Sequence, residues 1–105
     1  MGLTSEIASS VGIRVYRNGP MELVASADLG RFLEEVRTRG LRVLGLEGFR
    51  IVGSSLVPEM DAIADLSAIP CSAASEDTVD EALQFLCDVA SLNLFYEVSF
   101  ADRPG

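Results

Sequence analysis

The chain has 105 residues, 16 acidic and 8 basic side chains and a formal net charge of -8. The length fits one compact domain, and the charge disfavours nucleic acid as a direct ligand. Hydrophobic residues make up 49% of the chain and the mean hydropathy is +0.31, so it is too apolar for a disordered acidic tail. It contains no His and no Lys, which excludes a histidine proton shuttle, a histidine ligand to zinc and Schiff-base chemistry.

The N-terminal part of the sequence predicts a leader followed by a β-hairpin. Residues 1–10 show no sustained hydrophobic period, so we expect a loose leader ahead of a single α+β domain over residues 11–105. Apolar and polar residues then alternate over residues 13–16 and 21–25, as in paired strands. The Asn18-Gly19 sequence between them is typical of a tight hairpin turn.

A helix is predicted next. Ser26 is a capping residue at its start, and Gly40 is placed to end it in a left-handed conformation. Between them, apolar residues recur at the helical spacing i, i+3, i+4 and i+7. These residues are Leu29, Phe32, Leu33 and Val36.

The middle of the chain predicts a strand and then a short helix. Residues 41–52 are aliphatic on both parities, which indicates a long strand kinked at a glycine, or a tight strand pair. Residues 56–57 are expected to form only a brief returning strand, because Pro58 has no backbone N–H to donate to the sheet. The acidic residues that follow Pro58 indicate a short helix over residues 59–67.

The last third predicts an amphipathic helix and a closing strand. The helix begins at Ser75 or Asp77, and the strand covers residues 94–100, where apolar residues alternate with others. The fold class is therefore α+β, a small, mostly antiparallel sheet with helices packed on one face. A ferredoxin-like split βαβ topology is favoured, and a barstar-like α/β arrangement of three layers is second.

Acidic residues concentrate in the second half of the chain, where residues 51–105 contain ten acids and one Arg. Such a surface repels phosphate and attracts cationic proteins. We therefore expect a protein partner with a basic surface, and neither a nucleic acid nor a membrane. The residues expected to face that partner are Asp61, Asp65, Asp77, Asp80, Glu81 and Asp88.

The two cysteines do not indicate a metal or catalytic site. Cys71 and Cys87 have no His or second Cys pair at metal-ligand spacing, and no His is present to activate a thiolate. Cys87 lies beside the apolar stripe of the last helix, so we expect it to be buried. The sequence thus predicts no catalytic residue, no metal and no cofactor.

A rival interpretation is a small dimeric enzyme, or a ligand-sensing or accessory domain. Its pocket would lie between sheet and helices and use Glu47, Tyr96 or Glu97 as polar groups. Glu47 lies among aliphatic residues, so it either acts as a general acid or points outward at a strand bend. An accessory subunit would instead bury Phe95 or Tyr96 against another chain.

Three segments, residues 46–49, 57–67 and 94–100, add a resemblance to a class of proteins. With the size, acidity and α/β layout, they resemble small acidic bacterial immunity proteins, of which barstar-like inhibitors are one kind. The resemblance implies a cytoplasmic, non-catalytic inhibitor that docks on the basic active site of a cognate toxin. A cytoplasmic location also agrees with the lack of a long apolar run or a signal peptide.

Overall fold

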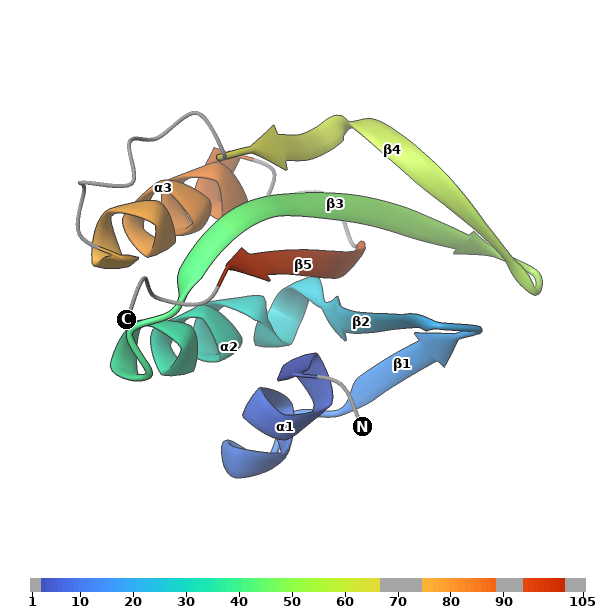
Figure 1. Cartoon of the computed structure of the whole chain (residues 1–105). Coiled ribbons are helices and arrows are strands. Elements are labelled where there is room, and N and C mark those ends of the chain that lie inside the picture. The colour runs from blue at the N-terminus through green and yellow to red at the C-terminus, as the bar shows by residue number, and fades with distance from the viewer. Residues whose placement is uncertain (1–2, 67–74, 89–93, 102–105) are drawn as a thin grey trace.

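The computed structural model describes residues 3–66, 75–88 and 94–101, which form three helices and five strands (Figure 1). In chain order these elements are α1 (Leu3–Ser10), β1 (Val15–Asn18), β2 (Met21–Ala25), α2 (Ser26–Thr38), β3 (Arg42–Val52), β4 (Ser55–Asp65), α3 (Ser75–Asp88) and β5 (Phe95–Ala101).

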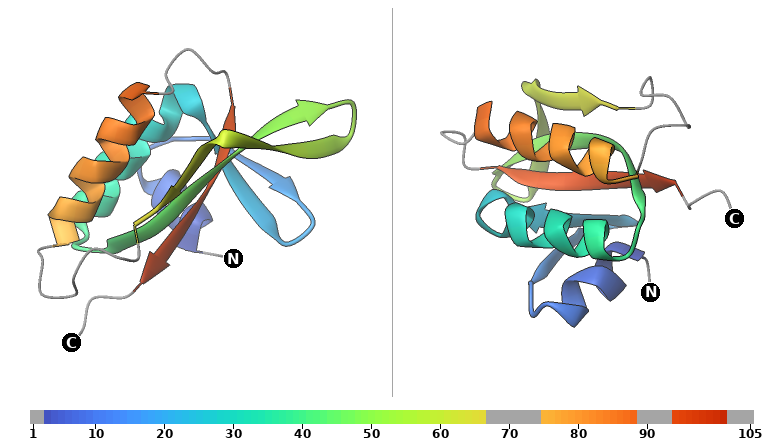
Figure 2. Two further views of the ribbon diagram at one scale, coloured as in Figure 1. Left: turned by 90° about the horizontal axis from the view of Figure 1, so that it is seen from above. Right: turned by 90° about the vertical axis from the view of Figure 1, so that its left-hand side faces the viewer.

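The five strands form one antiparallel sheet in the order β1-β2-β5-β3-β4. Strand β5 is inserted between β2 and β3, which are joined through α2, and β3 is inserted between β4 and β5, which are joined through α3. The α+β class is therefore confirmed, and each strand-helix-strand unit has a strand of the other unit inserted between its own two strands. The described helices all lie on one side of the sheet, so the described residues form two layers and not three (Figure 2).

Alternation along β5 separates the two faces of the sheet. Tyr96 and Val98 are buried on the helix-facing side, and Phe95 and Glu97 point to the opposite side. Phe100 continues the helix-facing row, and its ring lies 6.0 Å from the ring of Phe32 on α2. The main hydrophobic core therefore fills the space between the sheet and the helices.

The loose leader expected over residues 1–10 is wrong for its described part. Leu3–Ser10 form helix α1, in which Ile7 and Ala8 are fully buried. A helix of eight residues is too short to show a clear hydrophobic period, and its stability comes from packing on the rest of the core. This packing was not visible in local sequence.

The hairpin and the helix after it are confirmed, with one correction. Gly19 has a φ of +59° in the hairpin turn, and Gly40 has a φ of +68° after α2, as their positions required. Ser26, however, does not cap the helix. The N-cap is Ala25, without a side-chain cap bond, and the N–H of Ser26 donates to the carbonyl oxygen of Leu94 at 2.9 Å.

The short helix expected over residues 59–67 is wrong, because β4 continues as a strand through Pro58 to Asp65. An edge strand tolerates Pro58 because the missing N–H can face away from the sheet. The register then shifts, so that Gly48 alone on β3 lies opposite residues 59–62 on β4. Pairing with β3 along this hairpin outweighs the weak helix preference of the acidic stretch.

Candidate functional site

The acidic residues expected to form one surface are divided between two elements. Asp61 and Asp65 are exposed on β4, at the edge of the sheet, whereas Asp80 and Glu81 are exposed on α3, in the helix layer. The four side chains therefore do not form one continuous face.

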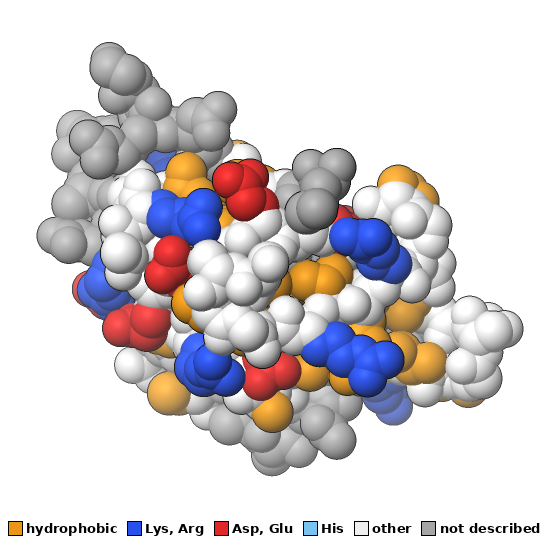
Figure 3. Space-filling view, turned by 90° about the horizontal axis from the view of Figure 1, so that it is seen from below, with side chains coloured by type: hydrophobic (Ala, Val, Ile, Leu, Met, Phe, Trp, Pro, Cys, Tyr) orange, Lys and Arg blue, Asp and Glu red, His pale blue; other side chains and the backbone are white. Residues whose placement is uncertain are grey.

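The charge on α3 is also partly compensated. Arg37 of α2 donates a hydrogen bond to Asp80 at 2.6 Å, and this bond is the main cause that raises the pKa of the Arg37 guanidinium. Asp77 and Asp88 belong to α3, but their side chains lie outside the described part of the structure. Figure 3 shows the molecule from below, relative to the view of Figure 1, and on this face acidic and basic side chains are interspersed.

A different group of acids lies on the side of the sheet that no described helix covers. The strand register places Glu47 of β3 directly opposite Glu97 of β5 and next to Ile63 of β4. Asp65 follows Ile63 by two residues and so shares this face. A shallow hollow of about 300 Å³ lies here, lined in part by Glu47, Ile63 and Asp65. We call Glu47, Ile63, Asp65 and Glu97 the acidic face.

The two glutamates of the acidic face are an uncompensated pair. Both are half-buried, and among the described residues neither has an ion-pair partner. Like charges directly opposite each other on neighbouring strands destabilise a sheet. From the sequence, strand alternation is compatible with Glu47 and Glu97 lying on the same side of the sheet. Their direct pairing, however, depends on the insertion of β5 beside β3, which local sequence does not predict.

In the described part of the chain, the three polar groups of the rival interpretation do not share a pocket. Tyr96 is fully buried on the helix-facing side, whereas Glu47 and Glu97 point to the opposite side. The hydroxyl of Tyr96 has no hydrogen-bond partner among the described residues, and burial raises the pKa of this phenol. The three polar groups therefore do not converge on one ligand.

The β1-β2 and β3-β4 hairpins project from the rest of the molecule (Figure 2), and a groove on the uncovered side is lined by residues of both. It has a volume of about 320 Å³, and we call it the arm groove. In Figure 3 the two hairpins project at the right, with hydrophobic and basic side chains between them. The side chains that line it include Arg14, Tyr16, Leu23, Ile51 and Leu56.

The β3-β4 hairpin also carries the exposed large hydrophobic residues found in the described part of the chain. Isolated apolar side chains at a surface are ordinary, but a group on one projecting hairpin indicates an interaction surface. These residues are Ile51, Val52, Val57, Met60 and Ile63.

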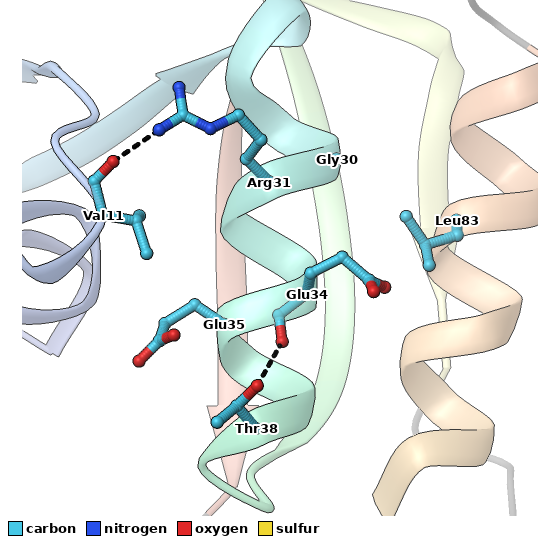
Figure 4. Close-up of a pocket in the computed structure, with 7 residues that line it drawn as sticks. All are labelled: Val11, Gly30, Arg31, Glu34, Glu35, Thr38 and Leu83. Carbon is cyan, nitrogen blue, oxygen red and sulfur yellow. Dashed lines mark hydrogen bonds between the residues drawn. The ribbon is translucent and has the colours of Figure 1, made fainter.

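Another hollow, of about 700 Å³, runs along the outer side of α2 between Val11 and Leu83 (Figure 4). Its charged side chains already make bonds within the protein. Arg31 donates to the carbonyl oxygen of Val11 at 2.6 Å, and Glu35 accepts from Arg39 at 3.0 Å. The hollow is therefore best explained as the seam between packed helices.

The described residues also bear on the metal and cysteine expectations. Among residues 3–66, 75–88 and 94–101, no three His, Cys, Asp or Glu side chains are arranged to hold a metal ion. Cys87 is exposed, so its expected burial is wrong. The stripe that α3 buries runs through Val79 and Ala82, and Cys87 lies off it. Cys71 is outside the described residues.

On the side of the sheet that no described helix covers, carboxylates, exposed aliphatic side chains and arginine occur together. In the helices that the structure describes, none has both the length and the apolar character required to cross a membrane. Comparisons of this chain with protein-family models, with curated proteins and with solved structures find no match.

Proposed function

We propose that the chain is a non-catalytic protein-binding domain that docks its acidic face on a basic surface of a partner protein. The observation that carries this proposal is the direct opposition of Glu47 and Glu97 on an uncovered sheet face. A partner's Arg or Lys placed between the two carboxylates turns a repulsive pair into two charge-assisted hydrogen bonds.

The apolar surroundings of the acidic face support a protein partner. Ile63 is 40% exposed directly beside Glu47. Protein interfaces combine an apolar centre with charged groups that select the partner. The net charge of -8 further accelerates encounter with a basic protein.

The more specific form of this proposal is an immunity protein whose partner is a bacterial toxin with a basic active site. The acidic charge, the small size and the α+β fold support this form. Coexpression with the candidate toxin tests it: the cells should survive with the wild-type chain and die when the acidic face is neutralised. Equal survival with the neutralised variant would contradict it.

The general proposal is tested with two double variants that remove the same charge from opposite sides of the molecule. Glu47→Gln with Glu97→Gln neutralises the acidic face, and Asp80→Asn with Glu81→Gln neutralises the helix layer. A partner recovered from lysate at low salt is identified and purified, and its Kd is measured by calorimetry. We expect the first pair to weaken binding by about tenfold or more and the second by less than about twofold.

Salt dependence gives an independent check on the same complex. Affinity should fall steeply as salt is added to the wild-type chain, and less steeply for the Glu47/Glu97 double variant. The proposal is wrong if the helix-layer pair weakens binding as much as the acidic-face pair, or if affinity is indifferent to salt.

A further inference from the structure

The arm groove is a concave apolar surface whose walls come from different hairpins. Tyr16 and Leu23 of the β1-β2 hairpin line one wall, and Ile51 and Leu56 of the β3-β4 hairpin line the other. Ile51 remains 46% exposed although it faces the groove. The volume of about 320 Å³ is at the lower end of the range for ligand pockets, so it suits one or two side chains of a bound segment.

The groove also contains an arginine without an acidic partner in the described structure. The guanidinium carbon of Arg14 lies 5.0 Å from the centroid of the Tyr16 ring, and this cation-π contact orients its planar group. Among the described residues Arg14 makes no ion pair. Arg17 differs, because it pairs with Glu22 at 3.4 Å.

An aromatic contact joins the groove to the acidic face. The ring of Tyr16 meets the ring of Phe95 edge-on, with the centroids 4.7 Å apart. Phe95 precedes Glu97 by two residues on β5, so both side chains lie on the uncovered side of the sheet. One extended chain can therefore cross from the arm groove to the acidic face.

We propose that the arm groove is a binding site for a peptide segment of the partner in which an aliphatic side chain is followed by a carboxylate. The aliphatic side chain packs against Leu23, Ile51 and Leu56, and the carboxylate accepts hydrogen bonds from Arg14. Although the protein as a whole is acidic, the positive charge of Arg14 favours an acidic segment of the partner, whereas the acidic face favours a basic surface of the same partner. The inference rests on the proposed function only in taking the partner as the source of the segment.

A pair of isosteric probes tests the groove without the partner. The first is a capped tetrapeptide of alternating leucine and aspartate, and the second replaces each aspartate by asparagine. Both are titrated into the ¹⁵N-labelled full chain and followed by NMR. We expect the acidic probe to shift the amide signals of Tyr16, Leu23, Ile51 and Leu56 with an affinity of about 1 mM, as for other small ligands, and the neutral probe to bind about tenfold more weakly.

Charge variants connect this difference to one residue. Arg14→Gln should remove the preference for the acidic probe, whereas Arg14→Lys should keep most of it. Arg31→Gln is the matched control, because it removes an exposed arginine from α2 outside the groove. Equal shifts with both probes, shifts that map away from the groove, or a preference that survives Arg14→Gln would each overturn the inference.

The outcome is separable from that of the proposed function. The probes never contact the partner, so an inactive groove leaves the result of the Glu47 and Glu97 variants standing. Conversely, probe binding at Arg14 stands even if the acidic face makes no contribution to partner affinity.

Discussion

The hydroxyl of Thr78 accepts a hydrogen bond at 3.0 Å from the backbone N–H of Val43, and both residues are fully buried. The register between β3 and β5 shifts between Val43 and Gly45, where an irregularity leaves ladder groups to be satisfied by other partners. Helix α3 is thus fixed to the start of β3 by a polar contact inside the core.

Thr78→Val should destabilise the protein by about 1–3 kcal/mol, because it keeps the side-chain shape but leaves the buried N–H of Val43 without this acceptor. Denaturant unfolding measures the change. Thr78→Ser retains the hydroxyl and should cost less. Equal stability of Thr78→Val and the wild type would show that the bond contributes nothing.

Two glycine substitutions should have opposite effects. At Gly48 an added Cβ would lie 2.8 Å from the Cβ of Ala62 and 3.0 Å from a ring carbon of Tyr96, so Gly48→Ala should cost about 1–3 kcal/mol through overpacking. Gly30 lies within α2 with nothing within 4 Å of such a Cβ, so Gly30→Ala should add about 1 kcal/mol. Thermal unfolding of the two variants compares them, and a neutral Gly48→Ala would contradict the close approach.

Tyr96→Phe should change the pH dependence of stability. Burial raises the pKa of Tyr96 above its ordinary value of 10.0, so the phenol ionises at a lower pH in the unfolded chain than in the folded protein. The stability that the neutral phenol contributes is therefore fully present below pH 10 and is lost as the pH rises through the folded-state pKa. Tyr96→Phe should therefore reduce the fall in stability above pH 10. At pH 7 it should leave stability unchanged or raise it by about 1 kcal/mol, since the lost hydroxyl has no described partner.

Tyr16→Phe is the control for the tyrosine prediction, because Tyr16 lies half-buried on the arm groove. Denaturant unfolding between pH 7 and 11 compares the two variants. The same alkaline loss of stability in Tyr96→Phe and in the wild type would show that Tyr96 does not cause it.

Ile7→Ala tests whether helix α1 is an integral part of the domain. The fully buried side chain should cost about 2–5 kcal/mol when it is truncated. Ser9→Ala, at an exposed position of the same helix, should change stability by less than about 0.5 kcal/mol. If both variants unfold at the wild-type denaturant concentration, α1 does not contribute to the core.

Glu97→Gln should stabilise the free chain while it weakens partner binding. Removing one of two opposed carboxylates should raise the free energy of unfolding by about 0.5 kcal/mol at low salt, and the gain should shrink at high salt. Glu81→Gln, at an exposed position of α3, is the charge-matched control. A destabilised Glu97→Gln would indicate that Glu97 makes a favourable contact in the free chain.

Local signals in the sequence were sufficient for several elements. The Asn18-Gly19 turn correctly predicted the first hairpin, and the helical spacing from Leu29 to Val36 correctly predicted α2. Alternation over residues 94–100 correctly predicted β5. Each signal comes from neighbouring residues of one segment, where backbone preference and side-chain period agree. The α+β class followed from their order.

The tertiary structure decided what those signals could not. Strand β4 exists because β3 supplies a hairpin partner, and α1 exists because Ile7 and Ala8 find space in the core. Insertion of β5 beside β3 brings Glu47 and Glu97 together across 50 residues of sequence. Such contacts depend on which segments meet after the chain has closed large loops, and local sequence does not specify this. Composition therefore predicted an acidic, folded domain, whereas the strand order determined that Glu47 and Glu97 lie opposite each other.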